Sequence, residues 1–297
     1  MLDKKINLLE RFKELNRPLI LDGAMGSLLQ QKGIEGDPAL WYSKTNLVNS
    51  DLIKTIHEDY IKAGADIITT NTFRTNPAAI KLSAQNIDQN DFVKKSIQLA
   101  LEARADDKII IAGSNAPAED CYQKERTIPK YELEYNHKKH IELLWENGAD
   151  IIWNETQSHW DEIEIIAKFC SANSLPFAVN FYFTESLNLL SGEPLFEAID
   201  FINEFKPDVI GFNCIKPNTF KEYYRKNKIK GNWGFYYNCG AGNINDEHIS
   251  CGINQLEYIN EAKHFLPGNP IFIGSCCGSS PLHTKAIKDY FNEVYRN

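Results

Sequence analysis

The stretches KAGADIITTNT (residues 62–72) and ENGADIIWNET (residues 146–156) are two copies of one pattern, and this pattern decides the predicted fold. Each copy has a glycine, an aspartate and then a short apolar run that ends in polar residues. A third relative, KPDVIGFNC (residues 206–214), has a proline in place of the glycine. The repeat of a glycine or proline, a short apolar run and a polar end indicates the βα unit of a parallel sheet.

Helices are expected before the first two copies. Ahead of Gly64, apolar residues recur at helical spacing over residues 52–61, after a capping region at residues 49–51. A weaker pattern of the same kind over residues 141–145 precedes Gly148. Glycine suits the left-handed conformation in which many helices end, so both glycines are expected to terminate their helices.

Eight apolar runs along the chain are predicted to be buried strands. Most are nearly continuous, as expected for parallel strands that are covered on both faces. The runs are residues 18–23, 66–71, 108–114, 150–155, 176–182, 208–213, 232–238 and 270–275. Eight such strands in 297 residues, with no Pro/Ser-rich linker between them, predict an α/β fold, a single-domain (β/α)8 TIM barrel over residues 1–297. The alternative is an open doubly wound sheet; its dinucleotide-binding version is disfavoured because no Gly-x-Gly-x-x-Gly turn follows the first run.

The composition bears on partners and location. With 32 basic and 40 acidic residues, the formal net charge of −8 disfavours nucleic acid and anionic membrane surfaces as partners. Residues 1–18 contain no apolar signal region, and no segment approaches the roughly 18 apolar residues of a membrane span. We therefore expect a cytoplasmic protein that acts on small molecules. Its seven cysteines are then free thiols, metal ligands or a nucleophile rather than a disulfide framework.

Polar and thiol residues gather where the predicted strands end. In a (β/α)8 barrel the active site lies at the carboxyl ends of the strands. The residues at these ends are Asp22, Asn71, Ser114, Glu155, Tyr182, Asn213, Cys214, Asn238, Cys239, Cys276 and Cys277. Because they come from all eight predicted strands, they indicate one functional rim.

Three of these thiols, Cys214, Cys276 and Cys277, end the sixth and eighth strands, which a single strand separates. Adjacent cysteines do not readily form a disulfide with each other. Three converging thiolates suit zinc, and three protein ligands leave a fourth position open, as in catalytic zinc sites. The spacing alone leaves a second interpretation open, in which these residues are buried structural thiols.

Four motifs carry a resemblance to a known family. They are LILDGAMGSLL (19–29), TTNTFRTN (69–76), GFNC (211–214) and GSCCGSSPLH (274–283). In this order they resemble the homocysteine S-methyltransferase family over about residues 18–286. LWYSK (40–44) is similar to the smaller members, which use S-methylmethionine or S-adenosylmethionine as methyl donor.

The resemblance implies a zinc-dependent barrel with Cys214, Cys276 and Cys277 as the metal ligands, which transfers a methyl group to the thiol of homocysteine and gives methionine. A thiol with a pKa near 8.5 is mostly protonated at neutral pH, and coordination to zinc deprotonates it. The thiolate can then attack a methyl group on a positively charged sulfur or nitrogen. Because a sulfonium leaves as a neutral thioether, no catalytic residue beyond the metal site is expected.

The amino-acid end of homocysteine needs contacts of its own. Asp22 and Glu155 are the candidates for its ammonium, since both are acids on the thiol-bearing rim and the family has acids at both positions. The backbone of Gly23 and Ala24 is the candidate for its carboxylate. Asn213 is a further candidate contact, although an amide at a strand end could instead satisfy backbone groups.

The other thiols and the histidines are expected to be structural. Cys239 ends the seventh strand beside the proposed ligands and is interpreted as a neighbour of the metal site, not a ligand. His57, His137 and His140 fall on predicted helices and are interpreted as surface or packing residues. His283 falls where a helix is expected to start.

Several positions depart from the family pattern. Ser275 stands where the family has the glycine before the cysteine pair, and Gly278 and Ser279 follow the pair where the family has Arg/Gly-Thr. The loops at residues 115–120 and 155–158 also differ. Two alternatives therefore stay open. One is a methyltransferase subunit that depends on a separate corrinoid protein, and the other is an inactive relative that binds zinc or thiols.

Overall fold

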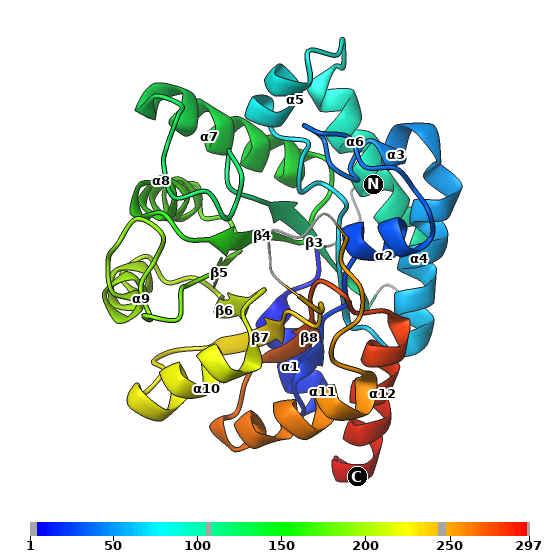
Figure 1. Ribbon diagram of the computed structural model, residues 1–297, viewed down its shortest axis with the longest axis vertical. Helices are drawn as coiled ribbons and strands as arrows, with labels where there is room; N and C mark the ends of the chain where they lie inside the picture. The colour runs from blue at the N-terminus through cyan, green and yellow to red at the C-terminus, as the bar shows by residue number, and fades with distance from the viewer. Residues whose placement is uncertain (1–4, 105–107, 243–247, 296–297) are drawn as a thin grey trace.

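The eight predicted strands form one parallel sheet that closes into a barrel. The computed structural model describes residues 5–104, 108–242 and 248–295 (Figure 1). The strands are β1 (Leu19–Ile20), β2 (Ile67–Thr69), β3 (Ile110–Asn115), β4 (Ile151–Gln157), β5 (Phe177–Phe181), β6 (Val209–Asn213), β7 (Trp233–Tyr237) and β8 (Phe272–Ser275). Their order is β1-β8-β7-β6-β5-β4-β3-β2, and a parallel bridge between Leu21 and Ile67 joins β1 to β2. The predicted (β/α)8 barrel is confirmed, and the open doubly wound sheet is not formed.

Most helices surround the strands on the outside of the barrel, whereas the first helix of the chain packs against the side chains inside it (Figure 1). The helices are α1 (Leu8–Leu15), α2 (Gly26–Gln31), α3 (Thr45–Val48), α4 (Ser50–Ala63), α5 (Pro77–Ser83), α6 (Gln89–Ala103), α7 (Lys130–Glu146), α8 (Trp160–Ala172), α9 (Leu195–Asn203), α10 (Pro217–Lys226), α11 (Gln255–Ala262), the 3-10 helix η1 (Lys263–Gly268) and α12 (Pro281–Val294). In the described part of the chain, none of them is long and apolar enough to span a membrane.

The apolar core has two layers, because successive residues of a strand point to opposite faces. On β4, Trp153 joins the cluster inside the barrel and Ile152 joins the larger cluster between the sheet and the helices. α1 packs its apolar side chains against the inner cluster. The nearly continuous apolar runs of the sequence follow from this arrangement, since both faces of each strand are buried.

The glycines predicted to end helices do so. α4 ends at Ala63, and Gly64 follows with a φ of 110°. α7 is followed by Asn147 and then by Gly148, which has a φ of 115°. Both glycines are therefore in the left-handed region that favours glycine. Each turn directs the chain back into the next strand, β2 or β4.

Candidate metal and substrate-binding site

The structure brings the three predicted thiols together. Cys214 directly follows β6, and Cys276 and Cys277 directly follow β8. Their Sγ atoms all lie within 4.8 Å of one another, and the Sγ atoms of Cys214 and Cys277 are 3.5 Å apart. Thiolates bound tetrahedrally to zinc at about 2.3 Å lie roughly 3.8 Å apart, so the three residues fit such an ion. Their role as metal ligands stays a prediction.

The turn that carries the cysteine pair is fixed by backbone contacts. The N–H of Cys276 donates to the carbonyl of Tyr237, 2.7 Å away, and the carbonyl of Cys277 accepts from the N–H of Cys239 at 2.8 Å. Gly278 has a φ of 82°, and a Cβ there would lie 2.6 Å from the backbone of Gly240. Only glycine fits this position, so residue 278 sets the direction of the turn.

Cys214 is held in a left-handed conformation, with a φ of 55°, and Thr156 at the end of β4 has the same φ. This is unfavourable for a β-branched residue such as threonine. Asn213, which precedes Cys214, links this segment to Thr156. Its Oδ1 accepts from the N–H of Thr156 and its Nδ2 donates to Oγ1 of Thr156, both at 2.9 Å. Both ends of this amide are thus engaged within the protein. Contact of Asn213 with substrate stays a prediction.

The protonation of the thiols is unequal. Hydrogen-bond contacts with Cys276 and Cys277, and a further hydrogen bond from the Tyr122 hydroxyl, hold the pKa of Cys214 well below its usual range. Their contacts with Cys214 raise the pKa values of Cys276 and Cys277, and their burial adds to this effect. Cys214 is therefore the first of the three to ionise.

The two predicted acids lie on the same rim, where Asp22 is buried and Glu155 is half-buried. Burial raises the pKa of Asp22 well above its usual value, although the carboxylate accepts from the N–H of Thr69 at 2.8 Å. Glu155 accepts from the Ser114 hydroxyl at 2.5 Å and from the Tyr236 hydroxyl at 3.1 Å. Burial raises the pKa of Glu155 to about 7. Burial disfavours the charged form of a carboxyl group, and a nearby positive charge favours it. An ammonium group between these two acids would therefore stabilise them as carboxylates.

The backbone at Gly23 and Ala24 has partners of its own. The N–H of Ala24 donates to the Ser279 hydroxyl at 3.0 Å, and its carbonyl accepts from the Tyr60 hydroxyl at 2.7 Å. A Cβ on Gly23 would lie 2.7 Å from the Ser279 hydroxyl, so only glycine fits. The predicted contact of this segment with a carboxylate stays a prediction. Sequence reasoning missed Tyr60, which lies on the buried face of α4.

Thiols and acids open onto one cavity of about 1570 Å³. Its lining includes Trp41 and Phe73, whose ring centroids are 5.5 Å apart. Trp41 has a φ of 49°, which points to a tightly held loop. Typical sites for single small ligands measure about 300–1,000 Å³, so this cavity has room for an amino acid and a second substrate.

In the part of the chain that the structure describes, the remaining thiols and histidines do not join the three sulfurs in a group that could hold a metal ion. Among the described residues, Cys239 is not part of any group of potential metal ligands, and its fully buried thiol points to the carbonyl of Tyr237. His57, His137 and His140 are fully buried, so of the two interpretations, surface and packing, packing is the one that the structure supports. His283 lies in the first turn of α12 and contacts Ser280.

Two of the buried histidines belong to a polar network that the sequence did not indicate. His137 contacts Glu162 at 3.0 Å, and His140 contacts Thr75 at 2.9 Å and Asn115 at 2.9 Å. These partners come from segments far apart in the chain. On a helix, histidine spacing alone does not distinguish a solvated position from a buried one with polar partners.

The fold and the site together define a (β/α)8-barrel protein with a three-thiol centre and two acids, Asp22 and Glu155, at the carboxyl ends of its strands. The sequence model of the family described as homocysteine S-methyltransferase matches residues 19–291. The homocysteine S-methyltransferase of Escherichia coli is 30% identical over 298 residues, which cover 91% of this chain and 94% of that protein. The chain belongs to the homocysteine S-methyltransferase family.

Two further similarities extend this result. The selenocysteine Se-methyltransferase of Brassica oleracea var. italica is 24% identical over 313 residues, which cover 94% of this chain and 90% of that protein. The structure of the homocysteine methyltransferase MmuM from Escherichia coli in its metallated form matches with a TM-score of 0.79 at 24% identity. It covers 96% of this chain and 100% of its own, and it supports the barrel fold.

Proposed function

We propose that this protein transfers a methyl group from a sulfonium donor to the thiol of homocysteine, giving methionine, at a zinc ion held by Cys214, Cys276 and Cys277. The observation that carries the proposal is the convergence of three thiols on a cavity that two acids, Asp22 and Glu155, also line. The activities by which relatives are named support the acceptor, and the metallated form of MmuM supports a metal.

The three cysteines would act as ligands and leave one coordination position for the substrate. When bound, zinc would supply the positive charge that keeps the homocysteine thiol deprotonated at neutral pH. The lowered pKa of Cys214 favours metal binding, because this ligand gives up its proton more readily.

Asp22 and Glu155 would bind the ammonium of homocysteine and orient its thiol. Neither acid is required to move a proton during methyl transfer. The homocysteine sulfur forms a bond to the methyl carbon while the bond from that carbon to the donor sulfur breaks. The bonding electron pair stays on the donor sulfur, which becomes neutral, so the leaving group needs no acid.

The donor would lie on the side of the cavity that Trp41 and Phe73 line. Aromatic faces attract cations, and a sulfonium is a cation with little hydration to lose. This pocket supports S-methylmethionine or S-adenosylmethionine as the donor. The size of the cavity is consistent with a donor larger than homocysteine itself.

The experiment that tests the proposal is a methyl-transfer assay on zinc-loaded protein of measured metal content. Homocysteine is incubated with S-methylmethionine or S-adenosylmethionine in separate reactions, and methionine is quantified. Methionine formation that depends on zinc and on one of these donors is the expected result. Formation only with a methylated corrinoid protein would favour the subunit alternative, and no formation with any donor would favour the inactive relative.

The acceptor is tested in the same assay with selenocysteine in place of homocysteine. The relative from Brassica oleracea, whose name specifies that substrate, makes this comparison necessary. We expect homocysteine to be the better acceptor, because the chain has 30% identity to a homocysteine S-methyltransferase and 24% to the selenocysteine enzyme.

A further inference from the structure

A tyrosine from outside the strands contacts the three-thiol centre. The hydroxyl of Tyr122 donates a hydrogen bond to Sγ of Cys214, with the two atoms 3.0 Å apart. No motif in the sequence marks this residue.

The ring of Tyr122 has little freedom to move. It meets the ring of Tyr182 edge to face, with centroids 5.0 Å apart and an interplanar angle of 72°. The N–H of Tyr122 donates to the carboxylate of Asp120 at 2.8 Å, which sets the local turn. Both contacts direct the hydroxyl toward the sulfur rather than into solvent.

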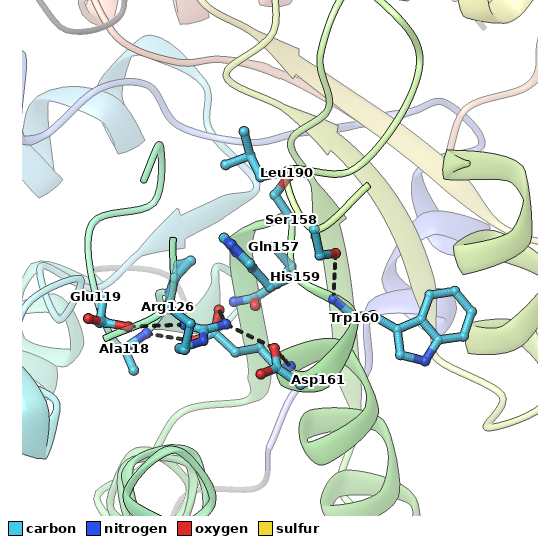
Figure 2. A network of polar contacts seen from close by, with 12 residues as sticks. Ala118, Glu119, Arg126, Gln157, Ser158, His159, Trp160, Asp161 and Leu190 are labelled. Carbon is cyan, nitrogen blue, oxygen red and sulfur yellow. Dashed lines mark hydrogen bonds and ion pairs between the residues drawn. The ribbon is translucent and has the colours of Figure 1, made fainter. Parts of the chain in front are cut away.

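Tyr122 belongs to residues 118–127, between β3 and α7, which we call the strap. The strap is fastened to α8 near both of its ends (Figure 2). At its start, the N–H of Ala118 donates to Oε1 of Glu162 at 2.8 Å. Near its end, the Arg126 guanidinium lies 3.2 Å from Glu162 and 2.9 Å from Asp161.

Further contacts hold the strap between these ends. Arg126 also pairs with Glu119 of the strap itself at 3.6 Å, as Figure 2 shows. The guanidinium of Arg74 donates to the carbonyl of Glu119 at 2.7 Å, and the ring of His159 contacts the carbonyl of Lys124 at 3.2 Å. Because Glu162 is fully buried, loss of Arg126 would leave part of a buried charge without its partner.

We propose that Tyr122 is a positioning residue of the methyl-transfer site, whose hydroxyl orients the Cys214 thiolate, and that the strap fastened by Arg126 keeps it there. A hydrogen bond to a thiolate fixes its direction and withdraws negative charge from it, which changes the bond that the sulfur makes to a metal. The proposal rests on the proposed function, because it assigns Cys214 to the metal. Tyr122 itself transfers no proton and does not touch the methyl group.

The test compares Tyr122→Phe with Tyr182→Phe in full-length protein loaded with cobalt(II). Each change removes one phenol oxygen from the same ring pair, and among the described residues only the Tyr122 hydroxyl bonds a sulfur of the centre. Without this bond, the Cys214 sulfur is more easily oxidised. We therefore expect the sulfur-to-cobalt charge-transfer band of Tyr122→Phe to move to longer wavelength, while that of Tyr182→Phe stays in place.

Metal affinity gives a second readout. Competition with a chelator should show cobalt affinity lowered about 10–100-fold in Tyr122→Phe, the usual effect of losing a partner of a metal ligand, and within about twofold of the wild type in Tyr182→Phe. A folded Tyr122→Phe protein that binds no cobalt is the extreme of this expected loss. A spectrum and an affinity equal to those of the wild type would overturn the proposal.

If the Tyr122→Phe protein does not fold, the Arg126→Gln variant tests the proposal instead. This change loosens the strap and leaves every residue at the sulfurs in place, so the band should shift in the same direction by a smaller amount. Arg225→Gln, on the surface of α10, is the matched control. An unchanged band in Arg126→Gln would count against the strap. These spectra need no turnover, so failure of the proposed function, seen as wild-type protein without methyl transfer, is distinguishable from failure of this inference.

Discussion

The amide of Asn213 holds Thr156 by two hydrogen bonds of 2.9 Å, which tie the end of β6 to the end of β4 across β5. Cys214 follows Asn213 and Glu155 precedes Thr156. One amide therefore fixes the backbone beside a proposed metal ligand and beside a proposed substrate ligand. The strained φ of 55° at both Cys214 and Thr156 persists because this pair holds it.

Replacement of Asn213 by alanine should lower both stability and metal affinity. The buried N–H of Thr156 would lose its acceptor, which costs about 1–3 kcal/mol in the free energy of unfolding. Denaturant unfolding of the metal-free protein measures this change, and chelator competition measures the metal. The exposed Asn86→Ala is the control and should change stability by less than about 0.5 kcal/mol. Equal stability of the two variants would contradict the role of Asn213.

The thiol centre makes a prediction about metal content. The wild type should bind one zinc per chain, and Cys276→Ala should lose most of the affinity because two thiolates seldom hold zinc. The exposed Cys251→Ala should keep the metal. Atomic absorption on dialysed protein gives the content. Full zinc and full activity in Cys276→Ala would show that the three thiols are not the ligands.

Replacement of either acid should weaken homocysteine binding and leave the zinc content unchanged. Glu155→Gln keeps the shape and removes the charge, so homocysteine should bind more weakly by about 1.5–3 kcal/mol, and Asp22→Asn should behave similarly. Calorimetric titration of zinc-loaded protein measures this effect. Glu142→Gln, on the exposed face of α7, is the control. Loss of zinc in either acid variant, or unchanged homocysteine affinity in both, would place these acids in the scaffold.

The raised pKa of Glu155 predicts a pH dependence. Its pKa of about 7 means that the carboxyl becomes protonated, and loses its attraction for an ammonium, as the pH falls from 8 to 6. Homocysteine affinity should therefore fall with pH more steeply in the wild type than in Glu155→Gln. Titration of the homocysteine thiol affects both proteins alike, so the difference between them isolates Glu155. Parallel pH profiles would contradict the assignment.

The raised pKa of Glu155 has the opposite effect on the folding stability of the metal-free protein, which should fall as the pH rises. The folded protein binds a proton at Glu155 more tightly than the unfolded chain, whose carboxyl has a pKa near 4.3. Stability from this group is thus full below about pH 4.3 and is lost as the pH rises through about 7. Glu155→Gln should lack this component, which thermal unfolding at a series of pH values measures.

The fold was predictable from sequence because its signals are local. Each buried run carries its own strand pattern, and Gly64 or Gly148 ends the helix before the strand. The strand bounds differ from the predicted ones by at most three residues, and the largest difference is at the end of β1, which was predicted to reach residue 23 and ends at Ile20. The meeting of Cys214 with Cys276 also followed, because strands six and eight of a barrel must lie one strand apart.

The contacts that orient these residues were not predictable. Tyr122 reaches Cys214 from a loop without periodicity, across 92 positions of sequence. The buried pairing of His137 with Glu162 joins two helices whose sequences only show polar residues at those positions. Such contacts depend on where a loop crosses the rim and on which helix faces meet, and neither is encoded within one segment.

Zinc-edge X-ray absorption of the zinc-loaded protein, with and without homocysteine, tests the central claim most directly. The account predicts three sulfur ligands at about 2.3 Å in the free protein and a fourth at a similar distance when homocysteine is added. Fewer than three sulfurs in the free protein, or no additional sulfur with saturating homocysteine, would contradict it.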